Sequence, residues 1–176
     1  MTAGATQADP LDRARTVRGV VFDVDGVLTD GRIIYSDDGH EIKAFNVQDG
    51  ASIKLLMSQG IDVAIITGRR SPMVARRARE LGVTHCLQGA ESKRAALAQL
   101  IEAGFAGGDA ALACIGDDIQ DLELFDAPEI ILSMTVPNAH PEVLARAHYV
   151  TDRCGGEGVA IEVAALILKA QDKWPF

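Results

Sequence analysis

Two aspartates one residue apart, Asp23 and Asp25, follow an apolar run of strand character and precede a glycine. Because alternate residues of a strand point to the same side, the two carboxylates would repel each other unless a cation lay between them. Carboxylates at the carboxyl end of a buried strand are typical ligands of Mg²⁺. An isolated Asp-x-Asp before glycine is also common as a solvated turn, so the remaining polar motifs must decide between the two interpretations.

Further polar residues follow other predicted strands or begin a helix. Thr67 directly follows the strand-like run 61–66, and Asp117 comes soon after the run 111–115. Lys93 lies at the start of the predicted helix that precedes this second run. Ligands of open α/β sheets bind beyond the carboxyl ends of the strands, so these side chains are expected to meet the aspartate pair at one edge. Carboxylates, a hydroxyl and a lysine together suit phosphoryl transfer, which needs a nucleophile, cations around the phosphate and a proton donor.

Short apolar runs alternate with helical patterns along most of the chain. The predicted strands are 17–24, 61–66, 83–87, 111–115 and 130–133, and the predicted helices are 49–59, 71–82, 91–103, 119–125, one opening at 140–141, and 158–173. This alternation predicts an α/β fold, a Rossmann-like doubly wound parallel sheet with helices on both faces. We expect a disordered or loosely ordered N-terminal segment, 1–16, and a single domain over 17–176.

The segment 30–48 breaks the alternation. Two β-rich pieces, 32–36 and 41–47, flank Asp37-Asp38-Gly39, and an Asp-Gly pair between such pieces predicts a β-hairpin. Both faces of this hairpin carry apolar side chains, and an isolated two-stranded hairpin is barely stable in water. We therefore expect the hairpin to dock on its own domain or on other subunits.

Composition narrows the possible partners. The 176 residues are 48% hydrophobic, which is typical of one globular domain, and the net charge of −8 argues against nucleic acid as a partner. Cys86, Cys114 and Cys154 are odd in number and lack metal-ligand spacing, so we expect free thiols in a reducing compartment. No run has the pattern of a signal peptide or a membrane span, and we expect a soluble cytoplasmic protein without membrane partners.

The order and spacing of the polar motifs resemble those of the haloacid dehalogenase superfamily of phosphohydrolases. The segments 23–29, 65–69 and 116–121 look like its first, second and fourth motifs, and Lys93 resembles the third. The resemblance runs from about residue 17 to the C-terminus. It implies a haloacid dehalogenase fold without a cap domain, because only the hairpin follows the first motif and one helix and one strand separate the second motif from the third.

The resemblance and the chemistry of phosphoryl transfer suggest the same catalytic roles. Asp23 would attack phosphorus and form an aspartyl-phosphate, and Asp25 would protonate the departing alcohol and later activate water. Thr67 would donate a hydrogen bond to a phosphate oxygen, and Lys93 would balance charge between Asp23 and the phosphate.

The cofactor implied by the resemblance is Mg²⁺. Its expected ligands are Asp23, Asp117 and, through a backbone carbonyl, Asp25. Asp118 and Asp121 are acidic enough to bind the metal, but we expect them to orient Lys93 or metal-bound water instead.

More narrowly, the chain resembles the capless, tetrameric 3-deoxy-D-manno-octulosonate 8-phosphate phosphatases, which act in the synthesis of lipopolysaccharide precursors. The resemblance lies in the hairpin and in the segments 45–50, 67–72, 139–141 and 155–158. It implies hydrolysis of that phosphorylated sugar acid, a homotetramer joined through hairpin 30–48, and a glycine-rich tail that reaches a neighbour's active site. The substrate-binding residues that it suggests are Gly68, Arg69, Arg77, Asn46 and Gly156.

Two departures from this family leave the substrate open. Glu157 and Ile161 stand where the family commonly has arginine, and the loss of two cations would weaken carboxylate recognition. A nonulosonate 9-phosphate of the sialic-acid type is the alternative substrate. A phosphomutase or phosphotransferase is disfavoured because it needs a lid to keep water from the intermediate. A non-catalytic oligomeric binding module is a third alternative, and the intact nucleophile and acid argue against it.

Overall fold

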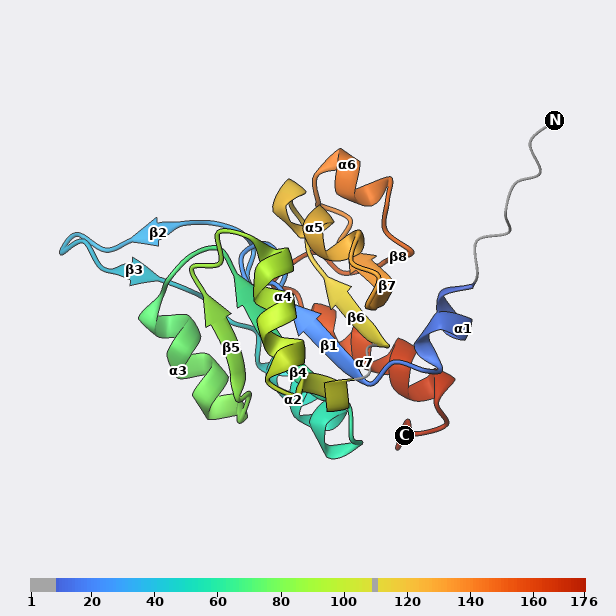
Figure 1. Ribbon diagram of the computed structural model, residues 1–176. Helices are drawn as coiled ribbons and strands as arrows, with labels where there is room; N and C mark the ends of the chain where they lie inside the picture. Colours follow the sequence, from blue (N-terminus) through green and yellow to red (C-terminus); the bar gives the residue numbers. More distant parts are fainter. Residues whose placement is uncertain (1–8, 109–110) are drawn as a thin grey trace.

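Six parallel strands form the central sheet of the protein, in the order β5-β4-β1-β6-β7-β8 (Figure 1). The computed structural model describes residues 9–108 and 111–176. The strands are β1 (Gly19–Phe22), β4 (Asp62–Thr67), β5 (His85–Gln88), β6 (Leu112–Ile115), β7 (Ile130–Thr135) and β8 (Tyr149–Val150). The chain adds strands on one side of β1 and then on the other, so the strand order reverses between β1 and β6, where open α/β sheets bind their ligands.

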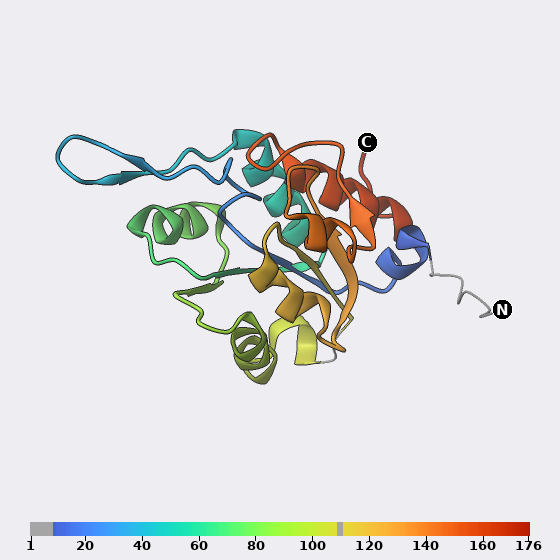
Figure 2. The same cartoon turned by 90° about the horizontal axis from the view of Figure 1, so that it is seen from above.

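Helices cover both faces of this sheet, as the view from above shows (Figure 2). One core contains side chains of α1 (Pro10–Ala14), α2 (Val47–Ser58), α3 (Pro72–Leu81), α6 (Pro141–Leu144) and α7 (Val159–Ala170). The other contains side chains of α4 (Lys93–Glu102), the 3-10 turn η1 (Phe105–Gly108) and α5 (Leu122–Phe125). Strand β1 feeds both, with Val20 and Phe22 in the first core and Val21 in the second. The predicted doubly wound α/β fold is confirmed.

The N-terminal prediction needs correction. Helix α1 is capped by Asp9, whose carboxylate accepts a hydrogen bond from the backbone N–H of Leu11 at 3.0 Å. Ala14 is fully buried, and Gln171 donates to its carbonyl at 3.0 Å. The expectation of a loosely ordered segment is therefore wrong for residues 9–16, while residues 1–8 lie outside the described residues. Five helical residues show no periodicity of their own, and α1 depends on packing against α7 and β7.

The predicted hairpin is present and forms a sheet of its own. Strands β2 (Ile34–Tyr35) and β3 (Glu41–Ile42) pair antiparallel, with Ile34 opposite Ile42, and they project beyond the body of the protein (Figures 1 and 2). The strands are shorter than predicted because the chain after Ile42 is irregular until α2 begins. The apolar side chains of the hairpin are exposed, with Ile33 at 51% and Tyr35 at 65%. Within one chain they have no cover.

The structure also describes the cysteines and the apolar character of the helices. All three cysteines are free, with Cys114 buried in β6 and Cys86 and Cys154 half-buried. None of the described helices has the length and apolar character needed to cross a membrane.

Asp49 is a buried acid that joins two helices. It lies in the first turn of α2, and its Oδ1 accepts a hydrogen bond at 2.7 Å from the backbone N–H of Ala160, near the start of α7. Its Oδ2 is buried without a hydrogen-bond partner. Burial raises the pKa of Asp49 to about 6, although the Ala160 N–H and the charges of Arg153 and Arg77 oppose the shift. The folded protein therefore holds this proton more tightly than the unfolded chain does.

This raised pKa makes the contribution of Asp49 to stability dependent on pH. Its contribution is fully present below the ordinary value of 3.8 and is lost as the pH rises through about 6, at most about 3 kcal/mol. We expect Asp49→Asn, which cannot titrate, to lack this component. The free energy of unfolding of the wild type relative to the variant should fall between pH 4 and 6 in urea denaturation. Asp37→Asn in the exposed hairpin turn is the matched control, and a difference independent of pH would contradict the assignment.

Candidate active site

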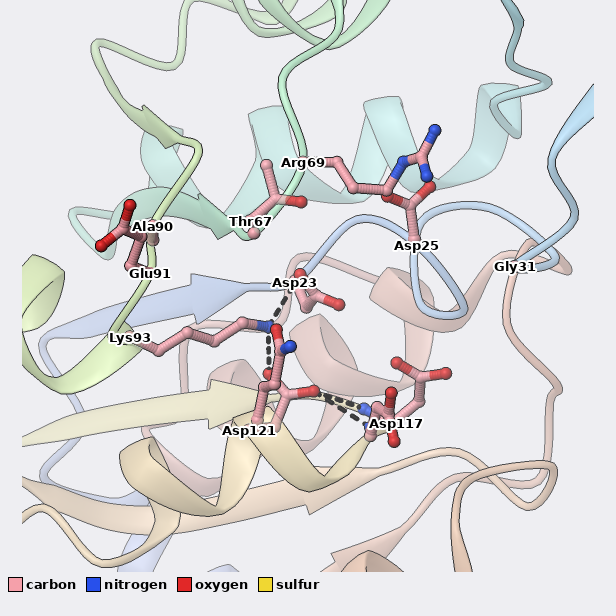
Figure 3. A pocket seen from close by; sticks show the side chains of 13 residues that line it. Asp23, Asp25, Gly31, Thr67, Arg69, Ala90, Glu91, Lys93, Asp117 and Asp121 are labelled. Atoms are coloured by element: carbon pink, nitrogen blue, oxygen red, sulfur yellow. Dashed lines mark hydrogen bonds and ion pairs between the residues drawn. The ribbon is translucent and has the colours of Figure 1, made fainter.

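The carboxyl ends of β1, β4 and β6 surround a cavity of about 480 Å³. Figure 3 shows its side chains pointing toward a common space. Nine of the residues singled out from the sequence line it: Asp23, Asp25, Thr67, Gly68, Arg69, Lys93, Asp117, Asp118 and Asp121. The parallel sheet thus brings together motifs that are up to about a hundred residues apart in the chain, as its topology requires.

A buried lysine holds the aspartate that ends β1. The Nζ atom of Lys93 lies 2.9 Å from Oδ1 of Asp23 and 2.5 Å from Oδ1 of Asp121, and its side chain is 4% exposed. Burial disfavours the ammonium charge, but the two carboxylates outweigh burial and raise the pKa of Lys93. Lys93 is therefore a permanent cation at this edge of the sheet. Ser92 fixes its place by capping α4 through the N–H of Ala95.

Asp121 orients both Lys93 and the loop after β6. While Oδ1 binds Lys93, Oδ2 accepts the backbone N–H groups of Asp117 at 3.0 Å and Asp118 at 3.1 Å. Gly116 permits this arrangement, because a Cβ there would lie 2.1 Å from the Cγ of Asp121. The geometry agrees with the expectation that Asp121 supports Lys93. Asp118 instead caps the short turn η2 (Ile119–Asp121).

The acids at this edge are crowded. Burial raises the pKa of Asp23 to about 7, with Lys93 opposing the shift and Asp121 adding to it. Burial also raises the pKa of Asp117 to about 7, and the nearby charges of Asp23, Asp121 and Asp118 add to that shift. Lys93 alone therefore does not neutralise the cluster.

The donor set fits a hard divalent cation. Among the described residues, carboxylate oxygens of Asp23, Asp117 and Asp121 lie within 4.8 Å of one another. Both oxygens of Asp121 already bind protein groups, which leaves Asp23 and Asp117 as the available carboxylate ligands. Oxygen donors of this kind suit Mg²⁺.

The second aspartate of the pair points elsewhere. Strand β1 ends at Phe22, so the period-two geometry that would place Asp25 beside Asp23 does not extend to it. The carboxylate of Asp25 pairs with Nζ of Lys43 and lies 3.8 Å from Nε of Arg69. Figure 3 shows it beneath Arg69, apart from the Asp23–Lys93 contact. Its side chain is thus outside the carboxylate cluster, and a metal contact through its backbone carbonyl stays a prediction.

Three of the residues suggested to bind substrate, Arg77, Asn46 and Gly156, do not line the cavity. Arg77 donates to the backbone carbonyl of Asn46 at 3.2 Å, and the side-chain amide of Asn46 donates to the carbonyl of Gly156 at 3.2 Å. The N–H of Gly156 donates to the carbonyl of Val27 at 2.9 Å. These contacts tie the start of α2 to the glycine-rich segment 155–158, which packs on the turn after β1 of its own chain. Within one chain these contacts are packing contacts, and direct substrate contact by the three residues stays a prediction.

Two polar cavity residues and two polar neighbours of Asp25 were given no role in the sequence analysis. Glu91 and Gln120 line the cavity, and Oε1 of Gln120 would lie 3.1 Å from a Cβ at Gly68. Glu41 and Lys43 of the hairpin reach Arg69 and Asp25. A charged residue in an exposed hairpin carries no local signal of such a contact, since the contact depends on how the hairpin leaves the sheet.

Comparison with known proteins identifies the family. No family model matches the chain. The chain is 45% identical to the 3-deoxy-D-manno-octulosonate 8-phosphate phosphatase of Yersinia pestis over 170 aligned residues. The aligned region covers 97% of this chain and 89% of the relative. The corresponding protein of Escherichia coli K12 is 42% identical over the same length. This chain belongs to the 3-deoxy-D-manno-octulosonate 8-phosphate phosphatase family.

Solved structures of this family have the same fold. The Yersinia pestis phosphatase superposes with a TM-score of 0.88 at 44% identity, covering 94% of this chain and 88% of the other. The phosphatase of Moraxella catarrhalis, solved with magnesium, phosphate and the sugar acid KDO, superposes with a TM-score of 0.85 at 43% identity, covering 93% and 92%. A further neighbour, from Legionella pneumophila, is described as a hydrolase of the haloacid dehalogenase (HAD) superfamily, subfamily III A.

The carboxylate cluster predicts that Mg²⁺ stabilises the protein in a pH-dependent way. Below a pKa of about 7, Asp23 and Asp117 hold protons that the metal must displace, so affinity should rise with pH. At one fixed concentration, a hundredfold above Kd at pH 8, Mg²⁺ should stabilise the protein by about 2.7 kcal/mol at pH 8 and raise its melting temperature less at pH 6. Asp117→Asn should lose most of this effect. Equal stabilisation at both pH values would contradict the ligand assignment.

Proposed function

We propose that this protein is a Mg²⁺-dependent phosphomonoesterase that hydrolyses 3-deoxy-D-manno-octulosonate 8-phosphate to the free sugar acid and phosphate. The observation that carries the proposal is the pairing of Asp23 with the buried Lys93, beside the acids Asp117 and Asp121 and opposite the separately held Asp25. The names of the relatives supply the substrate.

The geometry is consistent with a two-step displacement. In the first step an oxygen of Asp23 bonds to phosphorus while the bond to the sugar oxygen breaks, and Asp25 gives its proton to that oxygen. In the second step Asp25 takes a proton from water, whose oxygen attacks phosphorus and frees Asp23. Lys93 holds Asp23 in place and offsets the charge of the phosphate, and Thr67 is placed to donate a hydrogen bond to a phosphate oxygen.

A bound Mg²⁺ would neutralise the phosphate oxygens and the nucleophile, so that two anions can approach each other. Asp23, Asp117 and the backbone carbonyl of Asp25 would hold it. Asp121 contributes indirectly, because it fixes the backbone of Asp117.

The sugar would occupy the outer part of the cavity, near Gly68 and Arg69. The guanidinium of Arg69 is 43% exposed and can form paired hydrogen bonds with a carboxylate. Glu157 and Ile161 add no cation there, so Arg69 would carry more of the recognition than in relatives with arginine at those positions.

We also propose that the hairpins of four subunits assemble this enzyme into a homotetramer. The support is the exposure of Ile33, Ile34, Tyr35 and Ile42 on a two-stranded sheet that a single chain leaves uncovered. Apolar hairpins of this kind are stable when other strands or subunits pair with them. An assembled hairpin layer would also bound the open side of the cavity.

Replacing the nucleophile tests the proposed chemistry. We expect Asp23→Asn to lower kcat on the octulosonate 8-phosphate at least a thousandfold without changing the circular dichroism spectrum, because the amide cannot form the aspartyl-phosphate. Asp37→Asn should keep full activity. Phosphate release with Mg²⁺ is the measurement, and a nonulosonate 9-phosphate should be assayed in parallel. Undiminished turnover by Asp23→Asn would overturn the mechanism, and preference for the nine-carbon compound would replace the substrate.

Charging the hairpin tests the proposed assembly. Ile34→Glu places a carboxylate on the exposed apolar surface, where its desolvation would oppose contact between hairpins. We expect sedimentation equilibrium to show a tetramer for the wild type and smaller species for this variant. Leu11→Glu, an exposed position on α1 away from the hairpin, is the matched control and should leave the tetramer intact. A monomeric wild type would refute the assembly.

A further inference from the structure

A buried lysine lies at the base of the hairpin, which is otherwise exposed. The side chain of Lys43 is 2% exposed, whereas its neighbour Ile42 is 48% exposed. Burying an ammonium group costs free energy unless anions surround it. The contacts of Lys43 therefore account for its position, and they lead to the active site.

Four alternating charges connect the hairpin to the cavity. Lys43 forms an ion pair with Oδ1 of Asp25, and its Nζ lies 3.6 Å from Oε1 of Glu41. Arg69 closes the ring, with Nη2 at 2.6 Å from Oε1 of Glu41 and Nε at 3.8 Å from Oδ2 of Asp25. The members come from the turn after β1, the hairpin and the loop after β4. The carboxylate of Asp25 is thus held from outside the central sheet.

Each aspartate of the pair consequently has a lysine of its own. Asp23 is held by Lys93 of α4, and Asp25 is held by Lys43 of the hairpin. Figure 3 shows the two carboxylates of the cavity in separate places, Asp23 beside Lys93 and Asp25 beside Arg69. Proton transfer to a leaving oxygen requires contact at hydrogen-bond distance, and a misplacement of about 1 Å can cost about a hundredfold in rate.

We propose that Lys43 is a positioning residue of this enzyme, which aims the carboxyl group of Asp25 at the leaving oxygen. The proposal rests on the proposed phosphatase function and extends it, because it gives the hairpin a part in the chemical step in addition to its part in assembly. A purely structural Lys43, which only stabilises the hairpin, is the competing interpretation.

Leaving groups of different basicity separate the two interpretations. The alkoxide of a sugar phosphate needs a proton as it departs, whereas 4-nitrophenolate departs readily without one. Lys43→Met keeps the apolar stem and removes the charge. Because Asp25 also acts in the second step, which both substrates share, the first step is measured by itself, as the rate of leaving-group release in a single turnover. For Lys43→Met we expect this rate to fall about 10- to 100-fold with the sugar phosphate and to stay within about twofold of the wild type with 4-nitrophenyl phosphate.

Three further variants complete the experiment. Asp25→Ala should show the same dependence on the leaving group, with a larger loss. Lys43→Arg keeps the charge but places it differently, so its loss of rate should also depend on the leaving group and should be smaller than that of Lys43→Met. If Lys43→Met does not fold, Lys43→Arg replaces it in the experiment. Lys54→Met, at an exposed position on α2, should match the wild type on both substrates.

The outcomes distinguish this proposal from the proposed function. If Lys43→Met loses the same factor on both substrates, changes only KM, or loses no activity, Lys43 is not a positioning residue and the phosphatase function stands. The melting temperature and the sedimentation coefficient, measured for each variant, show whether an equal loss on both substrates comes from unfolding or dissociation. If the wild type hydrolyses neither substrate in the presence of Mg²⁺, the proposed function fails and this proposal fails with it.

Discussion

The repulsion among carboxylates at the carboxyl edge of the sheet governs the architecture around the cavity. Asp23 and Asp117 retain a pKa of about 7 although Lys93 is close by, because burial and like charges act together. A chain that brings these acids together must also supply the groups that hold them apart. Asp121 does so by accepting two backbone N–H groups, and Gly116 by leaving room for that carboxylate. The same crowding makes the site receptive to a divalent cation and then to a phosphate.

The parallel sheet makes this crowding possible at moderate cost. Each acid follows a strand whose backbone groups are satisfied by its neighbours, so the strands are rigid up to the residue that precedes the functional one. Asp23 still donates its N–H to the carbonyl of Ile115 at 3.0 Å, which extends the ladder to the nucleophile itself. Asp25, two residues later, lies beyond the hydrogen-bonded part of the strand. The pair therefore combines one carboxylate fixed by the sheet with one placed by side-chain contacts.

This division explains which parts of the site the sequence could predict. Strand ends, helix caps and the polar residues that follow them are local patterns, and Asp23, Thr67, Lys93 and Asp117 were recognised from them. Lys43 was missed because its burial depends on the path of the hairpin. The packing contact of Arg77 with Asn46 was missed because a family motif does not state what its side chain contacts. Helix α1 was missed for a similar reason, since its stability comes from packing against α7 and not from its five residues.

The placement of Asp25 follows from where β1 stops. Had the strand continued for three more residues, its period would have put both carboxylates on one side, competing for the same cation. Because it ends at Phe22, the backbone turns through Gly26, whose φ of 85° favours glycine and where a Cβ would lie 1.9 Å from an oxygen of Asp117. The turn directs Asp25 toward Lys43 and Arg69. A nucleophile and a proton donor two residues apart thus acquire separate environments, which the opposite demands of attack and protonation require.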